Sequence, residues 1–150
     1  MQKLKAWLSE AYYIDQEISD KLMQINYLRE RLTNITASLS DIPGAPIKTN
    51  DVFAGAISKI VELEREIGRD VEGLLAARIE ISSLIDQLEN REYRLVLYKR
   101  HVLGRHWDAI AADMGYTRRH MRRIYNEAIR KLYEIQKKIL KFLKDVPKCP

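Results

Sequence analysis

Apolar side chains recur at helical spacing through the first 39 residues. From Ile14 onward they are separated by steps of 4, 4, 3, 3, 4, 3 and 4 residues, which places them in one stripe along a helix, close to a heptad repeat. Residues 38–51 then include Pro43, Gly44 and Pro46, which predict the end of this helix. The predicted stripe comprises Leu4, Trp7, Leu8, Ala11, Ile14, Ile18, Leu22, Ile25, Leu28, Leu32, Ile35 and Leu39.

A second helical stripe follows this break. Thr49, Asn50 and Asp51 offer side-chain oxygens that can accept the first free backbone N–H groups of a new helix. Two stripes around a short break predict a coiled-coil-like antiparallel hairpin whose helices are on the order of 50 Å long. Because a two-helix hairpin buries little apolar surface alone, we expect a homodimer, a higher homo-oligomer or a partner protein. The second stripe comprises Ile57, Ile60, Leu63, Ile67, Leu74, Ala77, Ile81, Leu84 and Leu88.

Three shorter helices are predicted between residues 91 and 132. The first ends near Gly104, the second ends before Gly115, where the chain can turn with positive φ, and Thr117 caps the third. Asp108 lies in the first turn of the second helix, where a negative charge suits the helix dipole. This order predicts a helix-turn-helix, whose last helix can enter a DNA major groove. The apolar positions are Tyr93, Val96, Leu97 and Val102 in the first helix, Trp107, Ile110, Ala111 and Met114 in the second, and Met121, Ile124, Ala128, Ile129 and Leu132 in the third.

The predicted fold class is therefore all-α. A long N-terminal antiparallel helical hairpin over residues 1–90 serves oligomerisation or partner binding, and a helix-turn-helix DNA-binding domain over residues 91–150 ends in a basic helix. The chain has only 6 Gly and 4 Pro, and this low count argues against a sandwich or barrel, because those folds need many tight turns. In the basic helix, we expect Ile135, Ile139 and Phe142 to pack on the hairpin or on a second copy.

The distribution of charge indicates a polyanionic partner for the C-terminal part. The 150 residues carry a formal net charge of +5. Residues 1–90 hold 10 Lys and Arg against 15 Asp and Glu, a net charge of −5, whereas residues 91–150 hold 16 against 6, a net charge of +10. Such asymmetry favours nucleic-acid binding by the second segment, the alternative being a solvated basic face.

The third predicted helix begins with a cluster of basic residues. Positive charge in the first turn of a helix opposes the helix dipole, so local stability does not explain the cluster. Arginine pairs with guanine O6 and N7 or with phosphate, so we expect base and phosphate contacts with double-stranded DNA. The alternatives are a surface helix without a ligand and an RNA site. The predicted DNA-binding residues are Thr117, Arg118, Arg119, His120, Arg122 and Arg123, with Lys99, Arg100 and Arg105 contacting the flanking DNA backbone.

The run WDAIAADMGYTRRHMRRIYNEAIRKL, residues 107–132, resembles the region 4 helix-turn-helix of sigma-70-type factors. It is still more similar to small phage-encoded regulators built on that module, such as the ArpU-like late transcription regulators. Asp108 to Ala111 match the first helix of that pattern, Gly115 the turn and Thr117 the start of the recognition helix. The resemblance implies a transcriptional regulator of a phage or mobile genetic element, an activator, with DNA contacts from Arg118, Arg119, Arg122 and Arg123. Residues 1–90 do not resemble the preceding module of a sigma factor.

Other classes of function receive little support. His101, His106 and His120 have spacings that do not form a metal cluster, and we expect them at the surface or facing DNA. Phosphate-loop and hydrolase motifs are absent from the sequence, so we expect no enzyme, no metal and no cofactor. The sequence contains no apolar run long enough to span a membrane and no signal-peptide core, and Cys149 is its single cysteine. We therefore expect the chain in the bacterial cytoplasm, without a membrane partner.

Two alternative functions remain open. A DNA-packaging protein similar to a small terminase subunit also joins a helix-turn-helix to an oligomerising helical part. An interaction protein whose hairpin binds host RNA polymerase is the other alternative.

Overall fold

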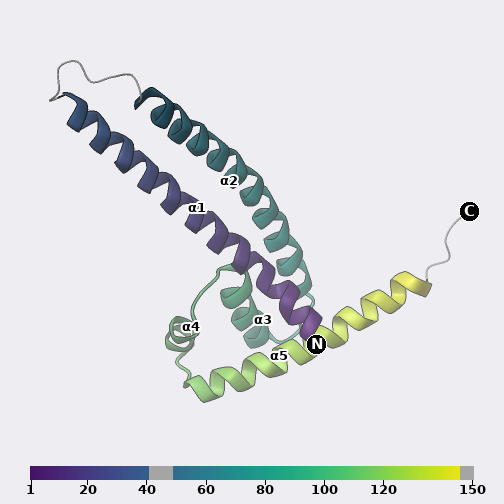
Figure 1. Ribbon diagram of the computed structural model, residues 1–150. Helices are drawn as coiled ribbons and strands as arrows, with labels where there is room; N and C mark the ends of the chain where they lie inside the picture. Colours follow the sequence, from purple (N-terminus) through teal and green to yellow (C-terminus); the bar gives the residue numbers. More distant parts are fainter. Residues whose placement is uncertain (41–48, 146–150) are drawn as a thin grey trace, which may run out of the picture. The chain divides into compact units, whose positions relative to one another are not determined.

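The computed structural model describes residues 1–40 and 49–145 of the chain, with side chains described over residues 1–38 and 51–142. All regular secondary structure in these ranges is helical, which confirms the all-α prediction (Figure 1). The elements are α1 (Gln2–Ser40), α2 (Thr49–Ile85), α3 (Arg91–Leu97), the π-helical segment η1 (Tyr98–Val102), α4 (Trp107–Met114) and α5 (Arg118–Asp145).

The first two helices end and begin close to the predicted break. α1 ends at Ser40 and α2 begins at Thr49, with Asp51 as an acidic residue in its first turn. The predicted breaking residues Pro43, Gly44 and Pro46 lie outside the described residues, as do Cys149 and the predicted capping side chains of Thr49 and Asn50.

The chain folds into two compact units. One unit, the arm, is Ile14–Leu74. The other unit, the body, joins Met1–Tyr13 to the chain from Leu75 onward. The first turns of α1 and the end of α2 therefore belong to the same unit as α3, α4 and α5. The functional division at residue 90 stays a prediction.

Within the arm, α1 and α2 run side by side in opposite directions (Figure 1). Lys21 pairs with Asp70 (Nζ–Oδ2 2.6 Å) and with Glu66 (Nζ–Oε2 3.1 Å). Farther along, Arg29 pairs with Glu64 (Nη2–Oε1 2.8 Å). As the residue number on α1 rises, the residue number of its ion-pair partner on α2 falls, which shows that the two helices are antiparallel.

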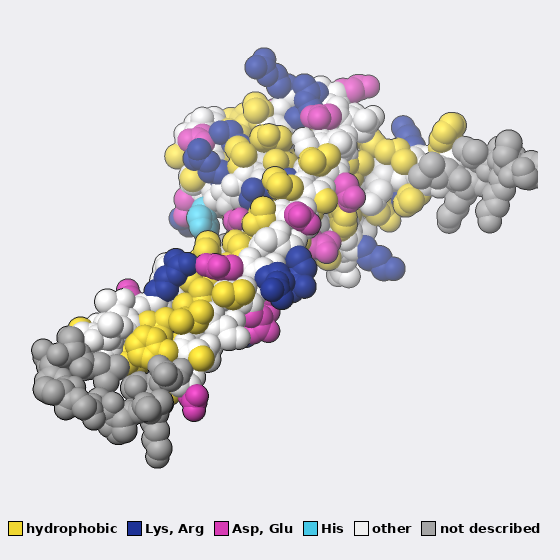
Figure 2. All heavy atoms as spheres, turned by 90° about the horizontal axis from the view of Figure 1, so that it is seen from above, with side chains coloured by type: hydrophobic (Ala, Val, Ile, Leu, Met, Phe, Trp, Pro, Cys, Tyr) yellow, Lys and Arg dark blue, Asp and Glu magenta, His cyan; other side chains and the backbone are white. Residues whose placement is uncertain are grey.

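The apolar stripes of the arm are only partly buried. Ile25 and Leu63 are buried, but Leu22 and Ile57, both predicted stripe positions, are about half exposed. Figure 2 shows apolar side chains on the surface of the arm beside the grey residues 41–48. Each arm helix has one helical neighbour among the described residues of the unit, and that neighbour covers only part of its apolar stripe. Burial of the rest by a second copy stays a prediction.

The body holds the larger apolar core. Its buried positions include most of the apolar residues predicted for the three short helices, with Tyr93, Trp107 and Met114 partly buried against that core. In the basic end of α5, Ile139 and Phe142 are exposed in the described chain, so neither is buried against the hairpin there, and their packing on a second copy stays a prediction. The buried residues are Leu4, Leu8, Ala11, Ile81, Ile85, Leu88, Val96, Leu97, Val102, Ile110, Ala111, Met121, Ile124, Ala128, Ile129 and Leu132.

Candidate nucleic-acid interface

α3 holds α5 and the turn before it through a small set of hydrogen bonds. The Asn90 Oδ1 atom caps α3 by accepting the backbone N–H groups of Glu92 (2.8 Å) and Tyr93 (3.2 Å). The Tyr93 hydroxyl donates to Glu127 Oε2 on α5 (2.8 Å), and the Tyr116 hydroxyl donates to the Glu92 carboxylate. These carboxylates raise the pKa of both phenols, because each bond is made to the neutral hydroxyl. α3 therefore holds both the turn before α5, through Tyr116, and α5 itself, through Glu127.

The turn between α4 and α5 has the predicted conformation. Gly115 adopts φ 67° and ψ 31°, in the left-handed region, and the next residue, Tyr116, donates its backbone N–H to the Ala111 carbonyl (2.9 Å). Thr117 Oγ1 then accepts the backbone N–H of His120 (3.2 Å), which confirms it as the cap of α5. Local chain geometry thus sets where α5 begins.

Substitution of Gly115 by alanine is expected to destabilise the protein by about 1 kcal/mol, because a β-carbon is unfavourable at positive φ. Apart from the residue itself and its two chain neighbours, no described atom lies within 4 Å of the position of the added carbon, so backbone strain sets the cost. The matched control is Gly73→Ala in the middle of α2, which is also unobstructed and should stabilise by up to about 1 kcal/mol. Urea unfolding of both variants measures the two effects, and a shared sign would contradict the assigned backbone conformation.

One exposed face of α5 carries four polar residues, here called the α5 stripe: Arg119, Arg122, Arg123 and Asn126. Their spacing of 3, 1 and 3 residues places them on one side of the helix. The opposite side is buried through Met121, Ile124, Ala128 and Leu132. The four stripe residues line an open groove of about 520 Å³ together with Thr117 and His120. The core therefore orients the stripe away from the body.

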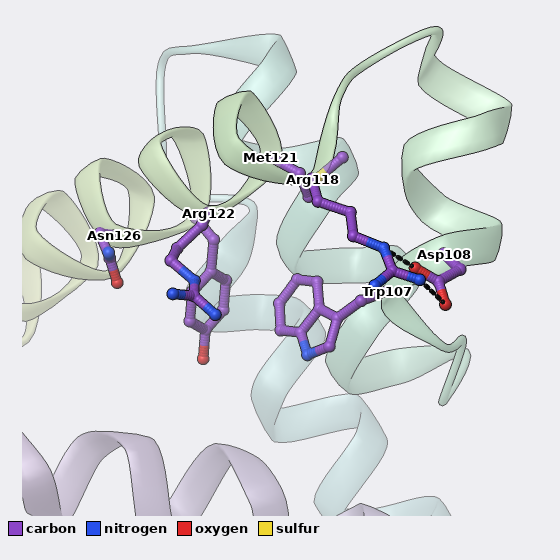
Figure 3. Close-up of a pocket in the computed structure, with 7 residues that line it drawn as sticks. Trp107, Asp108, Arg118, Met121, Arg122 and Asn126 are labelled. Atoms are coloured by element: carbon purple, nitrogen blue, oxygen red, sulfur yellow. Dashed lines mark hydrogen bonds and ion pairs between the residues drawn. The ribbon is translucent and has the colours of Figure 1, made fainter.

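Arg118 points in a different direction from Arg122 and Asn126, the two stripe residues drawn in Figure 3. Its guanidinium makes a bidentate ion pair with Asp108 in the first turn of α4, at 2.7 Å (Nε–Oδ1) and 2.9 Å (Nη2–Oδ2). The Arg118 side chain is 83% exposed, so the pair stabilises folding by less than about 1 kcal/mol. It does join the first turns of α4 and α5, beside a second open groove lined by Trp107, Arg122 and Asn126.

The three basic residues predicted to contact the flanking DNA backbone all have partners in the chain. Lys99 pairs with Asp113 of α4 (Nζ–Oδ2 2.9 Å) and thereby lowers the pKa of that carboxyl, and Arg105 lies 3.6 Å from the same oxygen. Arg100 donates to the Arg105 carbonyl (3.0 Å), and its guanidinium lies 4.8 Å from the centre of the Trp107 ring. These contacts tie η1 and the following loop to α4.

The sequence analysis placed all three histidines at the surface or facing DNA, but one of them is buried. His120 packs edge-on against Tyr116 with ring centres 4.5 Å apart, and its Nδ1 lies 3.2 Å from Arg123 Nη2. His106 is exposed, but His101 is only 6% exposed, so its predicted surface position is wrong. The π-helical turn of η1 places His101 in the body, within 3.0 Å of the Leu8 carbonyl (Nδ1–O).

Sequence reasoning missed Asn126 as a member of this face. The signal was present, because Asn126 lies four residues after Arg122 and three after Arg123, which are the intervals of one helix face. Positive charge alone does not identify it, since its side chain is neutral. Asp108 and Asp113 were also missed as partners of the basic residues, because 8 to 14 residues separate the members of these pairs.

Comparisons with models of protein families, with curated proteins and with solved structures found no match to this chain. In the described ranges, no three His, Cys, Asp or Glu side chains are grouped to hold a metal ion. Over the same residues, none of the helices is both long and apolar enough to cross a membrane.

Proposed function

We propose that this protein binds double-stranded DNA in a sequence-specific manner through the α5 stripe. α4, the turn at Gly115 and α5 then act as a helix-turn-helix, with α5 as the recognition helix in the major groove. The resemblance of residues 107–132 to sigma-70 region 4 and to small phage regulators extends this proposal to transcriptional regulation, in the role of an activator in a phage or mobile genetic element.

The observation that carries the proposal is the α5 stripe itself. Three arginines lie exposed within the first two turns of a capped helix, and the core holds that helix from the opposite side. Among the described residues, Arg119 and Arg122 make no ion pair or side-chain hydrogen bond, so both guanidinium groups are available to a ligand. Positive charge near the start of a helix does not stabilise that helix, so contacts to guanine or phosphate explain why arginines occupy these positions.

The arrangement also separates positioning residues from contacting residues. Arg118 is engaged by Asp108, and Lys99 and Arg105 are engaged by Asp113. These pairs connect α4 to α5 and to η1, in addition to the core packing that orients α5. Arg118, Lys99 and Arg105 therefore reach DNA phosphates only by sharing or releasing an aspartate, and the stripe supplies the primary contacts.

The proposal is tested by fluorescence-anisotropy titration of the full chain against two duplexes at about 50 and 200 mM salt. One duplex comes from the DNA that flanks its own gene, and the other has a random sequence of the same length and composition. We expect a preference for the native duplex that persists at the higher salt, because base contacts lose less affinity to salt than phosphate contacts.

Two results would contradict the proposal and favour one of the other functions. Equal binding to both duplexes that collapses at the higher salt would indicate backbone contacts alone, as expected of a packaging protein. No binding at the lower salt would remove DNA as a ligand. The arm would then be the functional part, and host RNA polymerase would be the first partner to test.

A further inference from the structure

Asn126 is the one uncharged member of the α5 stripe. It lies on the exposed face of α5, one turn after Arg122, and both side chains project from the same side of the helix (Figure 3). Asn126 lines the same two grooves as Arg122. Among the described residues it has no side-chain hydrogen bond, so its amide donor and acceptor both face solvent.

The chemistry of an asparagine at this position differs from that of its neighbours. A neutral amide adds nothing to the attraction for phosphate charge, and it adds no ion pair to the fold. Asparagine does offer one donor and one acceptor side by side, which match the N6 amino group and N7 atom of adenine in the major groove. Arginine in the same groove matches guanine O6 and N7.

We infer that Asn126 is a specificity-determining residue that reads an adenine, next to a guanine read by Arg122. Four residues separate the two, about 6 Å along the helix axis. Base pairs rise by about 3.4 Å each, so the adenine lies about two base pairs from the guanine when α5 follows the groove. This inference rests on the proposed function and adds a base preference that the arginines alone do not supply.

The test selects duplexes from a random-sequence library with the full-length wild-type chain and with three variants. Asn126→Ala removes the amide, and Asn126→Asp replaces it with a carboxylate, which accepts from the cytosine N4 amino group. Asn34→Ala is the matched control, since Asn34 is an exposed helical asparagine in the arm. Circular dichroism of each variant verifies that the helical content is retained.

The wild-type and Asn34→Ala chains are expected to select one motif containing an adenine about two base pairs from a guanine. For Asn126→Ala we expect the preference for that adenine to fall by about 5- to 150-fold, with the rest of the motif unchanged. For Asn126→Asp we expect cytosine to replace adenine at the same position. A structural role of Asn126 would not produce this exchange of bases.

The possible failures are distinguishable. If Asn126→Ala selects the wild-type motif with its adenine intact, the inference is overturned and the proposed function stands. The same conclusion follows if the variant loses affinity equally for all sequences, because that indicates a backbone contact. If the wild-type chain selects no motif at all, the proposed function fails, and this inference fails with it.

Discussion

Simultaneous replacement of Arg119, Arg122 and Arg123 by alanine is expected to lower the affinity for duplex DNA by at least about 100-fold. Each arginine that contacts a base or phosphate contributes about 1–3 kcal/mol to binding. The slope of log affinity against log salt should also flatten by about 2 to 3, as phosphate contacts are lost. All three side chains are exposed, so the helical content should be unchanged. Fluorescence anisotropy over a salt series measures both effects.

A matched control separates local contacts from overall charge. Arg31, Arg65 and Arg69 are exposed on the two helices of the arm, and their replacement by alanine removes the same three positive charges. The control variant should retain DNA affinity within a few-fold, since these three arginines belong to the arm and not to the proposed contact face on α5. Equal losses in the two triple variants would mean that net charge, not the α5 stripe, governs binding. Undiminished binding by the α5 variant would remove the stripe from the interface.

Acidification is expected to destabilise the body through His101. The pKa of this imidazole is lowered from 6.5 to about 4, chiefly because burial disfavours the charged ring. The hydrogen bond to the Leu8 carbonyl opposes this shift, and the nearby charge of Arg100 contributes to it. The Leu8 carbonyl only accepts, so the neutral ring carries its proton on Nδ1, and Nε2 accepts from the Tyr125 hydroxyl (3.3 Å).

The direction of the pH effect follows from the lowered pKa. Between pH 6.5 and about 4 the unfolded chain binds a proton at His101 that the folded chain does not, so stability falls as the pH falls. The contribution is fully present above pH 6.5, and about 3 kcal/mol is lost by pH 4. Urea unfolding of the full chain at a series of pH values from about 4 to neutrality measures this loss of stability.

The comparison variant is His101→Gln, whose amide can donate to the Leu8 carbonyl but does not titrate. We expect this variant to be less stable than the wild type near neutral pH and to lose less stability on acidification. The difference between the two curves isolates His101 from the carboxylates that titrate at lower pH. Parallel curves would show that His101 is not the group responsible.

The helices were predictable because their signals are local. Apolar spacing of three and four residues identified the buried side of α5, including Met121, Ile124 and Ala128. Gly115 and Thr117 identified the turn and the start of α5, since a positive φ and a capping hydroxyl depend only on neighbouring backbone. The α5 stripe lies on the side of the helix opposite to these buried residues. Its arginines could therefore be named from the sequence.

The partners of the basic residues could not be predicted in the same way. In the sequence, Arg118, Lys99 and Arg105 are three cations without an evident partner, yet each pairs with an aspartate on α4. Whether two such charges meet depends on how α4 packs against η1 and α5, which no periodicity encodes. The same reason explains the error at His101, because a π-helical turn changes the face that a residue presents.

The sequence by itself determined the helical class, the turn at Gly115, the start of α5 at Thr117, and the face of α5 that is left polar. These are consequences of backbone chemistry and of apolar periodicity over a few turns. The tertiary structure alone decided which cations are paired, that His101 is buried, and that Asn126 shares two grooves with Arg122. Each of these depends on distances between segments far apart in the chain, and packing sets those distances only after the helices have formed.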